Sequence, residues 1–242
     1  MRRLFSLPRI RWRHQLAPAA PGRKRERGVG LVEAAFVTPV FFTMLFGIIE
    51  GGMYMNDKLA TSNAVRAGAR EASAFGADGK ADMYTLASVR KQAGALRKDQ
   101  FEYVVIYKAS GYGEKPSTTC MAGTSVTGVC NVYTYSDIQK AFNQIAEEDA
   151  QAAAVAAGTV RTVDSSKIWF GCLTAGTNAG NSPDRYWCPG SRADTRAANN
   201  RAGPDYVGIY VKIKHPWLTK LFGSNQAISD QSVIQIEPRA EA

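Results

Sequence analysis

The longest apolar run in the chain lies near its N-terminus. Over residues 29–56 the only acidic side chains are Glu33 and Glu50, and no lysine or arginine occurs. A membrane-spanning helix needs about 20 mostly apolar residues, which residues 29–53 provide. A buried helix of a soluble protein would normally keep a polar stripe, but residues 34–49 have none apart from two threonines. The pattern predicts a transmembrane helix over residues 29–53.

After the span, the periodicity becomes that of a folded domain. Small residues recur at every fourth position and predict that the helix continues to about Phe75. The turn 76–79, with glycine at both ends, should end it. A second, amphipathic helix is expected over residues 86–96. The small residues of the first helix are Ala60, Ala64, Gly68 and Ala72.

Several segments have the composition of strands. Residues 101–109 are rich in β-branched and aromatic residues, and residues 207–213 alternate apolar and polar positions. Residues 233–237 are expected to form the last strand, and residues 169–170 the end of a further short one. The predicted fold class is α+β, with a long N-terminal helix and further helices packed on a small antiparallel sheet.

The connections between these elements are long. Ser136 and Gln139 match a capping box that opens a third helix, which the alanine run 150–157 prolongs. Residues 110–131 and 171–204 are rich in turn-forming residues and are expected to be irregular loops.

A short apolar cluster follows the alternating strand. It either rests on the membrane surface or forms a lid over the core, and the sequence leaves both interpretations open. Its members are Trp217, Leu218, Leu221 and Phe222.

The charge is distributed unevenly. Nine of the 30 lysines and arginines lie in residues 1–28, together with a single acidic residue, Glu26, so this leader carries most of the formal charge of +9. The rest of the chain has little excess charge to neutralise phosphates, and we expect no nucleic-acid binding. Basic residues beside a span stay in the cytoplasm. We therefore expect a single-pass protein with its N-terminus in the cytoplasm and residues 54–242 outside the cytoplasm.

The four cysteines lie far beyond the leader. An even number permits two disulfides in three connectivities, and we favour the local pairing because each bridge would then close a loop rich in small polar residues. No C-x-x-C motif occurs, which argues against a zinc or thioredoxin-like site. The favoured pairs are Cys120–Cys130 and Cys172–Cys188.

A candidate processing signal lies before the apolar run. Basic residues, then Gly28, then an apolar stretch with Glu33 five residues on, resemble the recognition site of type IV prepilin peptidases. The cut would fall between Gly28 and Val29. A carboxylate in a membrane helix is costly unless paired, so Glu33 either partners the new ammonium of a neighbouring subunit's Val29 or reaches back to the cytoplasmic interface. Gly30 is a competing cut site that would leave Glu33 at the third position.

Residues 28–76 resemble the TadE/TadF-like proteins of the tight-adherence pilus system, TadE most closely. The shared features are the glycine, the glutamate, a proline within the apolar run, Phe-Gly-Ile-Ile-Glu at its end and an alanine- and arginine-rich continuation. The chain end, Gln235–Pro238, also resembles that family, whereas residues 77–205 do not match it. Ala34 stands where major pilins often have an aromatic residue, which favours a minor pseudopilin. The corresponding residues are Gly28, Glu33, Pro39, residues 46–50 and residues 63–70.

The resemblance implies a pilin-like structural role in a type IVb (Flp) pilus assembly or secretion system. The implied partners are the membrane, a prepilin peptidase, TadF-like pseudopilins, pilin and inner-membrane platform proteins. Within the span, Pro39 should bend the helix. Gly47 and Gly51 are spaced for close approach of a second helix, with Glu50 between them.

Enzymatic motifs are missing from the sequence. Apart from His14 in the leader, His215 is the only histidine, too few for a triad or a histidine-rich metal site. The run 147–149 is interpreted as a solvated acidic helix face. We expect no enzyme activity, cofactor, metal or small-molecule substrate. The alternative is an extracytoplasmic binding or enzymatic domain whose anchor is a passive tether.

Overall fold

The computed structural model describes residues 26–194, 203–220 and 222–238. The chain divides into two compact units, residues 1–47 and residues 48–242, which are considered separately. Most of the predicted leader, including His14, lies outside the described residues, and so does Leu221 of the apolar cluster.

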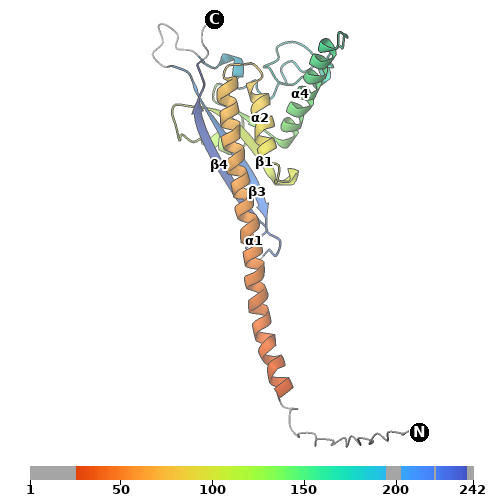
Figure 1. Cartoon of the computed structure of the whole chain (residues 1–242). Coiled ribbons are helices and arrows are strands. Elements are labelled where there is room, and N and C mark those ends of the chain that lie inside the picture. The colour runs from red at the N-terminus through yellow and green to blue at the C-terminus, as the bar shows by residue number, and fades with distance from the viewer. Residues whose placement is uncertain (1–25, 195–202, 221, 239–242) are drawn as a thin grey trace, which may run out of the picture. The chain divides into compact units, whose positions relative to one another are not determined.

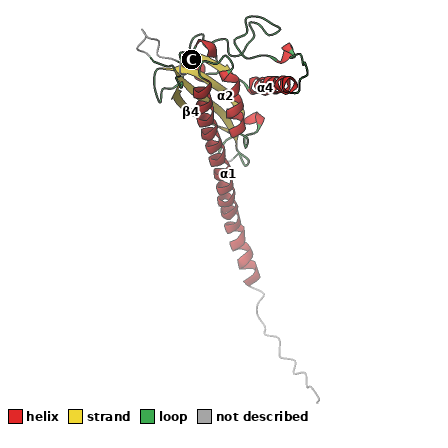
Figure 2. Ribbon diagram, turned by 45° about the horizontal axis from the view of Figure 1, so that its top comes forward, coloured by secondary structure: helices red, strands yellow, loops and turns green. Residues whose placement is uncertain are grey.

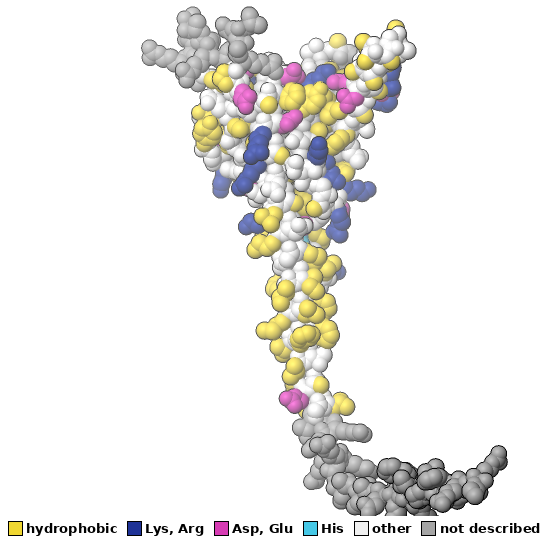
Figure 3. All heavy atoms as spheres, viewed as in Figure 1, with side chains coloured by type: hydrophobic (Ala, Val, Ile, Leu, Met, Phe, Trp, Pro, Cys, Tyr) yellow, Lys and Arg dark blue, Asp and Glu magenta, His cyan; other side chains and the backbone are white. Residues whose placement is uncertain are grey.

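Helix α1 spans Glu26–Phe75 and includes Pro39. Its end at Phe75 confirms the expected boundary. Gly76 stops the helix because it adopts a φ of +54°, a left-handed conformation that glycine takes without steric cost. The apolar side chains of the first part of α1 are largely exposed, as Figure 3 shows.

The second unit contains one four-stranded sheet with the order β2-β1-β3-β4, in which every neighbouring pair is antiparallel (Figure 1). The strands are β1 (Phe101–Ala109), β2 (Cys130–Tyr133), β3 (Tyr206–Pro216) and β4 (Asn225–Gln235). Ile106 pairs with Ile209 across β1 and β3, which places the apolar positions of both strands on a common face. The α+β fold with a small antiparallel sheet is confirmed.

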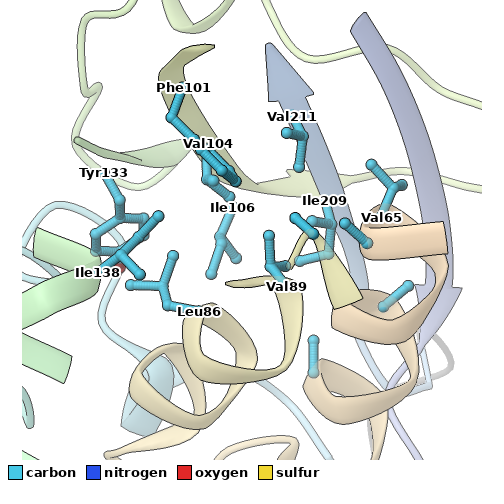
Figure 4. Packing of buried hydrophobic residues seen from close by; sticks show 14 of the residues in the cluster. Val65, Leu86, Val89, Phe101, Val104, Ile106, Tyr133, Ile138, Ile209 and Val211 are labelled. Atoms are coloured by element: carbon cyan, nitrogen blue, oxygen red, sulfur yellow. The ribbon is translucent and has the colours of Figure 1, made fainter. Parts of the chain in front are cut away.

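Helices cover one face of this sheet, as Figure 2 shows. The core lies between the sheet and the outer part of α1, α2 (Ala81–Gln92) and α4 (Tyr135–Ala156). Val65 of α1 and Val89 of α2 point toward Ile209 of β3 in Figure 4. The small residues of α1 are buried in this core, so their four-residue spacing marks the face that packs against the sheet. They are Ala60, Ala64, Gly68 and Ala72.

The opposite face of the sheet carries a smaller apolar cluster. Tyr107 and Tyr210 pack there against the Cys120–Cys130 bridge. A Cβ added to Gly208 would lie 2.1 Å from the Tyr107 ring, so only glycine leaves room for this tyrosine. The short helix α3 (Thr118–Met121) lies in the same loop.

Four boundaries differ from the sequence prediction. Helix α4 begins after Thr134, whose partner in the capping box is Asp137, so the expected Ser136 box was wrong by two residues. Helix α2 ends at Gln92, before Gly94. Strand β2 lies in the segment expected to be mainly loop, and β4 begins at Asn225 because polar edge positions also pair with β3.

Trp169 and Phe170 do not form a strand. The backbone N–H groups of both donate to Gln144 Oε1, at 2.7 and 2.8 Å. The Gln144 side chain on α4 thus accepts the backbone hydrogen bonds that a neighbouring strand would otherwise accept. The described part of the unit also has 3₁₀ turns at Lys98–Gln100, Ser165–Lys167 and Pro189–Ser191.

Candidate functional site

The apolar part of α1 is the first candidate site. Of the described residues, only the helix that contains this segment is long and apolar enough to cross a membrane, and its most apolar window has no buried residue. Leu31, Phe36 and Ile48 are 73%, 76% and 74% exposed. A core helix would bury such side chains, so the alternative of a soluble core helix does not fit. The segment is a candidate single-pass membrane anchor.

Glu33 is the only charged side chain between residues 30 and 49 of this helix. It is exposed, and no hydrogen bond or ion pair joins it to another described residue. A lone carboxylate on an apolar helix is a functional group by default. The side chains of Gly28 and Val29 at the expected cut lie outside the described set, although both residues belong to α1.

Gly47 and Gly51 face open space. A Cβ added to either would meet nothing within 4 Å, so no part of the described chain occupies the surface where a second helix could approach. Thr43 Oγ1 donates to the Pro39 carbonyl at 2.8 Å, which satisfies a hydroxyl that would otherwise face the apolar surroundings.

Glu50 differs from its glycine neighbours because its side chain is 1% exposed. The backbone N–H of Thr219, in the β3–β4 connection, donates to Glu50 Oε1. The carboxylate predicted at a helix interface is thus covered by the chain's own hairpin. Sequence reasoning missed this contact because the two residues are 169 positions apart.

About two helical turns further along α1, a buried polar cluster joins α1 to the sheet. Asp57 Oδ2 lies 2.7 Å from His215 Nδ1 and accepts a 2.7 Å hydrogen bond from Gln100 Nε2. The His215 ring forms T-shaped contacts with the rings of Tyr54 and Trp217. A cavity of about 330 Å³ lies beside this cluster, lined partly by Asp57, His215 and Trp217.

The Asp57–His215 pair matches two of the three members of a catalytic triad, but in composition only. No serine, threonine or cysteine is among the residues that line the cavity, so the cavity lining supplies no hydroxyl or thiol of the kind that a histidine activates in a triad. Among the residues described, no group of three or more His, Cys, Asp or Glu side chains could hold a metal ion. The pair therefore ties β3 to α1 across 158 positions of sequence.

The two disulfides join Cys120 to Cys130 and Cys172 to Cys188, the pairing favoured from the sequence. The second bridge lies in the long loop after Phe170. Asp184 accepts hydrogen bonds there from the backbone N–H groups of Gly171 and Cys172. Burial raises the pKa of Asp184, and these hydrogen bonds oppose the rise.

The sequence predicted that the acidic run on α4 is a solvated helix face, but one of its side chains is buried. Glu147 is 4% exposed and accepts hydrogen bonds from Lys167 and Arg161 side chains at 3.0 Å and from the Asp164 N–H at 3.2 Å. The Lys167 hydrogen bond, followed by those of Asp164 and Arg161, lowers the pKa of Glu147 to about 2. Glu147 thus fastens the loop after α4 to the helix.

Together these features define a class: an α+β domain with an apolar N-terminal helix whose exposed apolar surface bears one exposed carboxylate, that of Glu33. The family described as TadE-like protein matches residues 28–70, which confirms the expected resemblance over this segment. TadE-like proteins are structural, and the match points to a protein associated with the tight-adherence pilus. No curated protein and no solved structure matches the chain.

Proposed function

We propose that this protein is a minor pseudopilin-like membrane protein that acts structurally in the biogenesis of a tight-adherence (type IVb, Flp) pilus. The observation that carries the proposal is the exposed apolar helix in which Glu33 is the only charged residue between residues 30 and 49, within the segment that matches the TadE-like family. An unpaired carboxylate on a membrane helix is energetically costly, so a partner on another molecule is expected for it.

The proposed membrane arrangement has three parts. Residues 1–28 form a basic cytoplasmic leader, residues 29–53 cross the inner membrane, and residues 54–242 lie in the periplasm. The excess of basic residues before the span supports this orientation. Paired cysteines support it too, because disulfides persist in oxidising compartments such as the periplasm.

The proposed processing step is cleavage between Gly28 and Val29 by a prepilin peptidase. The new ammonium of Val29 would pair with the Glu33 carboxylate of a neighbouring subunit during assembly. The lack of a partner for Glu33 among the described residues supports this role. Gly47 and Gly51, whose surface is open, would admit a helix of pilin, a TadF-like pseudopilin or a platform protein.

N-terminal sequencing of the protein from its membrane tests the processing step. In cells with an active prepilin peptidase, the mature chain should begin at Val29. A chain that still begins at Met1 would overturn the assignment of the cut, and a start at Leu31 would move it to Gly30.

A pair of variants tests the role of Glu33. Glu33→Ala should leave membrane insertion intact and greatly reduce surface piliation, because the intersubunit ion pair is lost. Glu71→Ala removes a carboxylate from the outer part of the same helix and should leave piliation unchanged. Normal piliation with Glu33→Ala would remove the proposed role of this residue.

Exchange of the anchor separates the proposal from the tether alternative. If residues 29–53 are replaced with an unrelated apolar span, a structural pseudopilin should lose function although the domain remains on the membrane. Retained function would favour a periplasmic domain on a passive tether.

A further inference from the structure

The β3–β4 connection exposes large apolar side chains. Leu218 is 68% exposed and Phe222 is 58% exposed, while the Trp217 ring is partly buried and stacks on Tyr54 with centroids 5.7 Å apart. Isolated exposed apolar residues are common on protein surfaces, so their exposure alone identifies no partner. We refer to Trp217, Leu218, Thr219, Lys220 and Phe222 as the β3–β4 tip.

The position of the tip along α1 is what distinguishes it. The Thr219 N–H donates to Glu50, and Glu50 lies three residues before the predicted end of the span at residue 53. Ile48 and Ile49, in the preceding turn of α1, are 74% and 45% exposed. The tip therefore lies beside the last turn of the apolar helix, at the depth where a bilayer would give way to water.

The same contact shields an acidic residue from lipid at this depth. A carboxylate facing lipid is costly, but Glu50 is 1% exposed and receives a backbone hydrogen bond from the tip. Covering Glu50 places Leu218 and Phe222 on the outside at the same level. The exposed apolar surface of α1 thus continues onto the tip.

The remaining side chains of the tip have the chemistry of a membrane interface. Tryptophan is enriched at the level of the lipid headgroups, and Trp217 lies there against Tyr54. Lysine and arginine extend their charged ends toward phosphates from that level. Lys220 is exposed, and the exposed Arg97 lines the same cavity as Trp217 and Leu218.

We propose that the β3–β4 tip is a second membrane contact, in which Leu218 and Phe222 enter the headgroup region of the outer leaflet of the bilayer that α1 crosses. The inference rests on the membrane span of the proposed function and adds a lipid-binding element in the folded domain. Of the two interpretations open from the sequence, a lid over the core would bury Leu218 and Phe222, whereas both side chains are exposed.

Depth measurement with spin labels tests the proposal on the full chain in phosphatidylcholine–phosphatidylglycerol vesicles. A single cysteine would replace Leu218, Val40 or Val155 in turn, and each would carry a nitroxide. These positions are matched in exposure at 68%, 59% and 66%. Val40 lies in the predicted span and Val155 at the end of α4, and no native cysteine is free to react.

Accessibility to oxygen, which concentrates in lipid, is compared with accessibility to a water-soluble nickel complex. The label at Val40 should favour oxygen and the label at Val155 should favour nickel. The proposal expects a severalfold higher oxygen-to-nickel ratio at position 218 than at position 155. A Leu218 label as accessible to nickel as the Val155 label, or one shielded from both reagents by protein, would overturn it. If the Val40 label is also accessible to nickel, the result contradicts the membrane span of the proposed function.

Discussion

The Asp82 carboxylate at the start of α2 lies 2.6 Å from the Arg192 guanidinium, and both side chains are fully buried. Asn131 and the Tyr133 hydroxyl donate to the other oxygen of Asp82. Arg192 also lies over the Trp187 ring at 4.1 Å. Two segments more than a hundred residues apart are thus joined inside the domain by opposite charges that water does not reach.

Loss of one charge of the Asp82–Arg192 pair should destabilise the domain more than loss of both charges. Arg192→Met leaves the Asp82 charge buried without its counterion and should destabilise the domain by about 3–5 kcal/mol. In the double variant Asp82→Asn/Arg192→Met no charge remains, so it should be more stable than Arg192→Met alone. Urea unfolding of the detergent-solubilised chain, followed by near-ultraviolet circular dichroism, measures both. A double variant less stable than the single one would show that the charges themselves are not the source of the loss.

Glu147 should make the domain sensitive to acid. Its folded-state pKa is lowered to about 2 from an ordinary value of 4.5, so its contribution to stability is complete above the ordinary value. That contribution should be lost as the pH falls from there toward about 2. In Glu147→Gln the pH dependence of the melting temperature in this window should flatten, whereas Asp149→Asn, at an exposed position of the same helix, should retain it. An unchanged acid slope in Glu147→Gln would contradict the assignment.

The Cys172–Cys188 bridge should stabilise the long loop. The double variant Cys172→Ser/Cys188→Ser should lose about 2–4 kcal/mol, because the unfolded chain regains the freedom that the bridge removed. Thermal melting with and without a reductant measures the effect of each bridge in turn. The double variant should respond less to the reductant than the native chain does. An equal response would assign the sensitivity to Cys120–Cys130.

Gly68 should tolerate no side chain. A Cβ at this position would lie 2.5 Å from Cγ2 of Val89, so Gly68→Ala forces α1 away from α2 and should destabilise the domain by about 1–3 kcal/mol. Gly52→Ala, on the same helix with nothing within 4 Å, should be neutral or slightly stabilising, since alanine favours helix. Recovery of stability on adding Val89→Ala to Gly68→Ala would locate the clash, and equal effects of the two glycine variants would exclude it.

The sequence predicted those elements that are marked by a residue pattern extending over many positions. The apolar run predicted the exposed apolar segment of α1. The four-residue spacing of Ala60, Ala64, Gly68 and Ala72 predicted both the outer part of α1 and the face that it buries. The alternation in 207–213 located β3. Local spacing was also sufficient for both disulfides, because each closes a short segment.

The contacts that organise the domain were beyond such reasoning. Glu50 with Thr219, and Asp57 with His215, join residues more than 150 positions apart, and no periodicity connects them. Strand β2 has four residues, too few to show a pattern. Gln144 replaces a strand partner for Trp169 and Phe170, which a propensity for strand could not anticipate.

The hydrogen bond from Ser73 Oγ to the Gln235 carbonyl, at 2.7 Å, and that from the Glu237 N–H to the Ser73 carbonyl, at 3.2 Å, join the end of the first helix to the last strand. The packing of α1 is therefore completed only after the last strand, which is synthesised much later than this helix. Until β3 and β4 have been synthesised, the buried face of α1 has no sheet to cover it. A nascent chain shortened before Tyr206, which lacks both strands, should present that face, and with it a target for chaperones and proteases.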